Sequence, residues 1–123
     1  MPQYLLLLYA PETDEAGAEQ RWAELPRWYE VTTSLQEAGI LVSNNALFPV
    51  ESATTVRVRD GERELTDGPF AVTKEILAGY YLLECPDLDV ALDAAARLPM
   101  AGYGSVEVRR VMTEADVPSP GGG

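Results

Sequence analysis

The chain has 123 residues, of which 46% are hydrophobic, and its 9 basic and 20 acidic side chains give a net charge of −11 at neutral pH. This length suits one domain with a modest core, and the negative charge disfavours direct binding to nucleic acid, because the field would repel a polyanion. The chain contains no histidine, which excludes Ser-His-Asp and Cys-His catalysis and removes the usual ligand of zinc and non-haem iron. No glycine-rich dinucleotide or phosphate loop is present either. We therefore expect no metal and no cofactor, and any acid–base chemistry must use Asp, Glu, Tyr, Lys or Cys85.

No apolar run reaches the roughly 18 residues that a membrane span needs. The four leucines at 5–8 lack a basic leader and a cleavage site, so they read as part of a strand and not as a signal peptide. We therefore expect a cytoplasmic protein that makes no membrane contact. Cys85 is the only cysteine, which excludes an intrachain disulfide, and beside Pro86 it is expected to be a small core or strand-end residue.

The first half of the chain predicts a strand, a helix and a second strand. Both alternating sets of side chains at 3–9 are apolar, which is typical of a strand covered on both faces. From 18 to 38 apolar residues recur at helical spacing, and Pro26 either opens the main helix or kinks a longer one. Gly39 is expected to terminate that helix. Residues 40–48 then read as a strand.

The second half predicts a hairpin, a strand, a helix and a last strand. Residues 53–59 and 62–66 flank an Asp-Gly turn, and 53–59 place valines on one face and arginines on the other. Residues 78–85 form a strand that is again apolar on both faces. Asp87 is expected to cap a helix of about ten residues. The stretch 104–111 completes the set of strands.

This order of elements indicates an α+β sheet with its helices on one face. We place a single domain at 1–112 and expect 113–123, which are rich in proline and glycine, to be a disordered tail. Because the strands at 3–9 and 78–85 are apolar on both sides, a monomer would leave one apolar sheet face bare. We therefore predict a homodimer that packs sheet against sheet about a two-fold axis.

The stretch 54–99 resembles the DGPF-domain branch of the YCII-related proteins, and the likeness extends from "YLLLLY" near the start to "GSVEVRRV" near the end. Its specific parts are Asp67-Gly68-Pro69-Phe70, Lys74-Glu75 and Gly79-Tyr80-Tyr81. The resemblance implies a ferredoxin-like antiparallel sheet with helices on one face, assembled as a dimeric α+β barrel. The His-Asp pair often proposed for YCII-like enzymes cannot be carried over, because this chain lacks histidine.

The Asp67 turn is the centre of the candidate site. A carboxylate held there among apolar groups would have a raised pKa and act as general acid or base. Glu75 would tune the charge and Tyr81 would donate a hydrogen bond, which makes these three the candidate catalytic residues. The candidate ligand-binding residues are Tyr9, Phe70, Lys74, Glu107 and Arg109.

Asp67, Lys74 and Glu75 could instead have a purely structural role. Asp67 would then accept hydrogen bonds from its own backbone, and Lys74 and Glu75 would belong to a short exposed turn. Trp22 and Trp28, at helical spacing, are expected in the core or in an interface.

Two functions therefore stay open. The first is a homodimer that binds an unidentified small organic molecule, either as a plain binder or as a cofactor-independent isomerase, cyclase or lyase. The second is a non-catalytic regulatory or protein-interaction module, tied to transcription through a sigma-factor-type partner, as is often said of the DGPF branch. A closed pocket that joins Asp67 to Tyr81 or Arg109 would favour the first function. An exposed Asp67 would favour the second.

Overall fold

The structure, a computed structural model, describes residues 1–68 and 74–118. Within these residues the chain forms six strands, three α-helices and three short 3-10 turns. The strands are β1 (Gln3–Pro11), β2 (Leu41–Ala46), β3 (Thr54–Arg59), β4 (Glu62–Asp67), β5 (Glu75–Glu84) and β6 (Ser105–Arg110). The helices are α1 (Glu15–Ala23), α2 (Leu25–Glu37) and α3 (Leu88–Arg97), and the turns are η1 (Val50–Ser52), η2 (Pro99–Gly102) and η3 (Glu114–Asp116).

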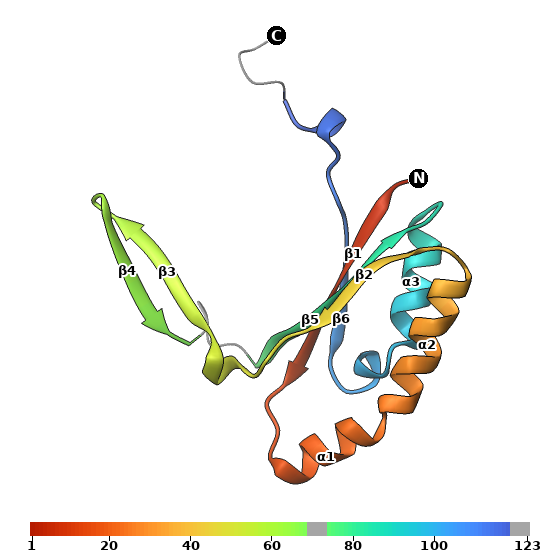
Figure 1. Ribbon diagram of the computed structural model, residues 1–123, viewed down its shortest axis with the longest axis horizontal. Coiled ribbons are helices and arrows are strands. Elements are labelled where there is room, and N and C mark those ends of the chain that lie inside the picture. Colours follow the sequence, from red (N-terminus) through yellow and green to blue (C-terminus); the bar gives the residue numbers. More distant parts are fainter. Residues whose placement is uncertain (69–73, 119–123) are drawn as a thin grey trace.

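Four strands form one antiparallel sheet with the order β2-β5-β1-β6. The three helices lie on one side of this sheet, and no described element covers its other side (Figure 1). We call that second side the open face; its central residues are Leu5, Leu7, Tyr80 and Leu82. The predicted α+β class, an antiparallel sheet with helices on one face, is confirmed.

The core lies between the sheet and the helices. Tyr4, Leu6 and Leu8 of β1 are buried there, whereas the residues between them are only half-buried on the open face. Tyr81 and Leu83 of β5 are buried in the same layer. The helices contribute Val31, Leu35, Ala91, Ala94 and Ala95. Each fully buried leucine contributes about 1.5–3 kcal/mol, and the small alanines of α3 allow that helix to approach the sheet closely.

The helical region at 15–37 is two helices and not one. Glu24 ends α1 and begins α2, and Pro26 occupies the first turn of α2. Proline lacks the N–H that a helix interior needs, and its ring clashes with the preceding turn, whereas the first turn tolerates it. Of the two alternatives for Pro26, the opening of the main helix is therefore the one observed.

The chain after β5 follows its prediction closely. The side chain of Asp87 accepts a hydrogen bond from the N–H of Val90 at 3.1 Å and so caps α3. Cys85 is fully buried at the end of β5, as expected for a small core residue. Burial raises the pKa of the Cys85 thiol, which keeps the side chain neutral.

The β3–β4 hairpin forms a sheet of its own and projects away from the main sheet and the helices (Figure 1). We call this hairpin the arm. Its turn uses positive φ angles at Asp60 (53°) and Gly61 (78°), in agreement with the Asp-Gly signal.

The described part of the segment after β6, up to residue 118, contains the short turn η3. The turn η3 begins with a capping box: the backbone N–H of Thr113 donates to the Asp116 carboxylate at 2.8 Å, and the Thr113 side chain accepts from the backbone N–H of Asp116. The Thr113 hydroxyl also lies 2.9 Å from the same carboxylate oxygen and can donate to it. These hydrogen bonds hold the pKa of Asp116 below its usual value.

Candidate functional site

A cavity of about 460 Å³ lies between the sheet and the helices α1 and α2. We call it the aromatic cavity, because aromatic side chains make up much of its wall. They are Trp22, Trp28, Tyr29, Tyr81 and Tyr103. They come from α1, α2, β5 and the segment between η2 and β6. The site therefore joins the neighbouring helices α1 and α2 to two segments that are distant from them in the sequence.

The helical period of α2 and the alternation of β5 bring the first contacts together. Trp28 and Thr32 are one turn apart on the same face of α2, and Tyr81 projects toward that face from the sheet. The rings of Trp28 and Tyr81 stack with their centroids 6.3 Å apart. The hydroxyl oxygens of Thr32 and Tyr81 are 2.7 Å apart and share a hydrogen bond. These contacts place a pair of hydroxyl groups beside stacked rings in the cavity wall.

Arg21 is the one formally charged side chain among the described residues that line the aromatic cavity. It lies in the last turn of α1, and its guanidinium carbon is 4.8 Å from the centre of the Tyr103 ring, a cation–π contact. Burial raises the pKa of Tyr103, while the nearby Arg21 opposes that rise. Tyr103 is thus a neutral phenol at neutral pH.

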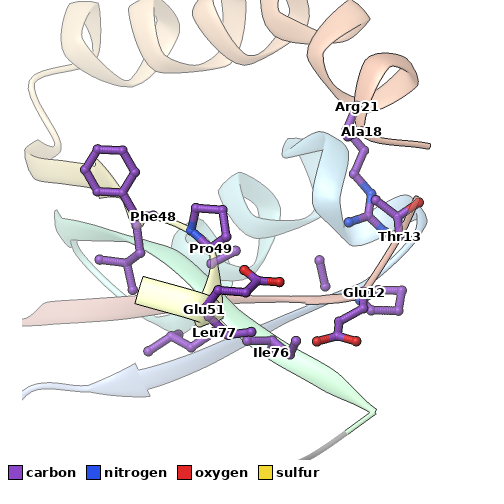
Figure 2. A pocket seen from close by; sticks show the side chains of 14 residues that line it. Glu12, Thr13, Ala18, Arg21, Phe48, Pro49, Glu51, Ile76 and Leu77 are labelled. Carbon is purple, nitrogen blue, oxygen red and sulfur yellow. The ribbon is translucent and has the colours of Figure 1, made fainter. Parts of the chain in front are cut away.

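A second cavity of about 430 Å³, drawn in Figure 2, shares part of its wall with the first. We call it the edge cavity. The two cavities share the lining residues Ala10, Thr13, Ala18, Arg21 and Ala78. Figure 2 shows Arg21 extending from α1 into the edge cavity, whereas Glu12 and Glu51 approach from the end of β1 and from η1. Both carboxylates belong to exposed residues.

Glu24 lies at the junction of α1 and α2, near Arg21 and Tyr103. Its Oε2 atom is buried and has no hydrogen-bond partner among the described residues. The negative charge of Glu24 adds to the rise in the pKa of Tyr103. Glu24 lines neither cavity, so we assign it no direct contact with a ligand.

Among the sequence-predicted catalytic residues, Tyr81 lines the aromatic cavity. Asp67 ends β4 on the arm, where it is exposed and lines neither cavity. Gly68 beside it has a φ of 99°, which fits the predicted tight turn. No backbone hydrogen bond to the Asp67 carboxylate is found within residues 1–68 and 74–118. Glu75 begins β5 opposite Pro11 and lines neither cavity.

The predicted ligand-binding residues are spread over the molecule. Tyr9 is on the open-face side of β1, and Glu107 and Arg109 are exposed on β6, opposite Leu7 and Leu5. Lys74 is exposed just before β5, and Phe70 lies outside the described residues. The structure therefore does not bring Arg109 or Asp67 to the cavity that contains Tyr81.

Sequence reasoning missed Arg21 and the role of the tryptophans. Trp28 packs against the core as expected, but it also lines the cavity, and Trp22 is 70% exposed at the rim. A usable signal was the density of large side chains in "RWAELPRWYE" around a helix break. One apolar stripe of a helix cannot bury so many large side chains, so some of them are left to line a cavity or a surface.

The chemistry available in the aromatic cavity follows from the side chains that line it. Its described lining contains no carboxylate and no thiol, and its polar groups are hydroxyls, amides and Arg21. No cluster of three or more Asp, Glu and Cys side chains suited to a metal ion is found among the described residues. The arrangement can hold an apolar molecule and orient one or two of its polar groups.

The antiparallel sheet, with its helices on one face and a cavity between sheet and helices, makes this an α+β protein of the ferredoxin-like kind. The chain matches the YCII-related domain over residues 2–115 and belongs to that family. The resemblance to YCII-related proteins is therefore confirmed, while the DGPF branch stays a prediction.

A stretch of 75 residues, 59% of the chain, is 49% identical to an uncharacterised protein of Rhizobium meliloti (strain 1021) and spans 60% of that relative's length. None of the helices in the described part of the chain has the length and apolar character that crossing a membrane would require.

Proposed function

We propose that this protein binds a small organic molecule in the aromatic cavity. The observation that carries the proposal is a cavity of about 460 Å³ whose wall includes the stacked rings of Trp28 and Tyr81, the Thr32–Tyr81 hydroxyl pair and Arg21. Small-molecule sites commonly combine such a volume with apolar walls and a few convergent polar groups. The family membership leaves the ligand open, since the Rhizobium relative is itself uncharacterised.

The proposal includes a cytoplasmic homodimer but does not extend to catalysis. A general acid or base has to reach the reacting atom, and Asp67, the candidate for that role, is exposed on the arm. An isomerase, cyclase or lyase that uses Asp67 would need the arm to deliver the carboxylate to a bound ligand. The described contacts within one chain offer no such arrangement.

Binding of N-phenyl-1-naphthylamine, a neutral fluorescent aromatic amine, tests the cavity directly. We expect its fluorescence to rise on binding to the wild-type protein. Ala46→Trp fills space on the cavity wall and should weaken binding about 10-fold or more, a cost of about 1.4 kcal/mol. Val42→Trp is the matched control, because Val42 is exposed on the same strand and lines neither cavity. Equal affinity of the two variants, or no binding by the wild type, would refute the proposal.

A second candidate function is a non-catalytic protein-interaction module. The observation that favours it is the arm, whose Val56, Val58 and Leu65 are each more than half exposed, together with the exposed Asp67. Exposed apolar patches of this kind often mark protein contacts. A transcription-related partner of the sigma-factor type rests on the family resemblance alone.

A further inference from the structure

We infer that the ligand of the aromatic cavity is an organic anion: a flat, mostly apolar molecule whose carboxylate or sulfonate pairs with Arg21. This inference rests on the proposed function, because it names the chemical class that the same cavity would take. It goes further by assigning to Arg21 the choice between charged and neutral ligands.

The first step concerns the charge of the cavity. Arg21 supplies the one formal charge of the described lining, and it has no ion-pair partner among the described residues. Its contact with the Tyr103 ring provides no oxygen acceptor, so its N–H donors stay available. A planar guanidinium binds a carboxylate through two parallel hydrogen bonds, and such charge-assisted bonds are about twice as strong as neutral ones.

The second step concerns the body of the ligand. Trp22, Trp28 and Tyr29 present flat apolar surface on α1 and α2, which favours rings over flexible polar chains. The Thr32 and Tyr81 hydroxyls leave room for one neutral polar group on the ligand. An aromatic or alicyclic acid satisfies both requirements.

The third step compares the competing charges nearby. Glu12 and Glu51 would repel an anion, but both are exposed on the edge cavity, where water and salt screen them. Glu24 is partly buried and also lies near Arg21, but it lines neither cavity. Arg21 is partly buried and lines both cavities, so an ion pair formed there is screened less and is closer to the ligand than Glu24 is. We expect the short-range attraction to Arg21 to outweigh the repulsion from these three carboxylates and from the net charge of −11.

The fourth step considers a cation as the alternative ligand, since aromatic walls also bind cations. Arg21 already occupies the Tyr103 ring, and a second positive charge beside it would be repelled. Displacement of N-phenyl-1-naphthylamine by phenyltrimethylammonium, but not by benzoate, would overturn the inference.

A matched pair of probes tests the role of Arg21. The ion 8-anilino-1-naphthalenesulfonate has the ring skeleton of N-phenyl-1-naphthylamine plus one sulfonate. We expect wild-type protein to bind the sulfonate about 10-fold more tightly than the neutral amine. Arg21→Gln should abolish this preference while its affinity for the neutral amine stays within about 2-fold. Arg27→Gln is the control, because it removes the same charge from an exposed position that lines neither cavity.

The outcomes separate this inference from the proposed function. If the neutral amine binds and the sulfonate binds no more tightly, the anion inference is wrong and the binding site stands. The anion inference also fails if Arg21→Gln and Arg27→Gln lower the sulfonate affinity equally, because only the net charge would then matter. If neither probe binds the folded wild-type protein, as checked by circular dichroism, both the inference and the proposed function fail.

Discussion

Tyr81 and Gly79 lie two residues apart on β5 and serve different purposes. Tyr81 points into the core layer and joins Trp28 and Thr32 in the wall of the aromatic cavity. Gly79 allows β2 to approach, since a Cβ atom added there would be 2.6 Å from the backbone oxygen of Asn45. The Gly-Tyr-Tyr motif thus combines a close backbone contact with a cavity residue.

Gly79→Ala should destabilise the protein by about 1–3 kcal/mol, because backbone atoms cannot yield to the added methyl group as a side chain can. Gly102→Ala is the matched control, since the space around Gly102 is open and its φ is not positive. Urea unfolding followed by circular dichroism measures both variants. A Gly79→Ala variant as stable as Gly102→Ala would show that β2 does not pack in this way.

The arm is the element whose sequence pattern and environment disagree most. Val56, Val58 and Leu65 share one face, while Arg57 opposite Glu64 belongs to the other. Both faces are exposed, so one amphipathic hairpin has no described layer to cover its apolar side. An isolated two-stranded hairpin is marginal in water.

Backbone amides of β3 and β4 should therefore exchange with solvent about 100-fold faster than those of the central strand β1 in dilute protein, because local opening of the arm exposes little apolar surface. Hydrogen exchange read by mass spectrometry measures this ratio. A partner protein bound to the apolar face of the arm would slow amide exchange in β3 and β4 and leave exchange in β1 unchanged. Protection equal to that of β1 in dilute protein would contradict the exposed arm.

The whole molecule presents a further uncovered surface, the open face of the main sheet. Leu5 and Leu7 on β1 lie beside Leu82 and Tyr80 on β5, and all four are only half-buried. This is the bare apolar face that led to the predicted homodimer, and it remains the strongest support for that assembly.

We expect the wild-type protein to be a dimer at micromolar concentration, and Leu7→Glu to weaken the dimer about 100-fold, because it places a charge at the centre of the interface. Leu88→Glu is the control, since Leu88 is exposed at the start of α3, on the helix side. Sedimentation or small-angle scattering measures the assembly. Added salt should strengthen the dimer by screening the repulsion between two acidic chains. A compact wild-type monomer would refute the two-fold packing.

The sequence by itself determined the strands, the two-faced apolar character of β1 and β5, the Asp87 cap, the Asp60-Gly61 turn and the family. These features follow from alternation, helical period and neighbouring residues, which are local properties of the chain. Only the tertiary structure decided that Arg21, Trp28 and Tyr81 line one cavity, and that Asp67 and Arg109 lie elsewhere. The reason is that strand order and the side on which helices pack depend on long-range contacts, and those are not encoded by the spacing of residues within one element.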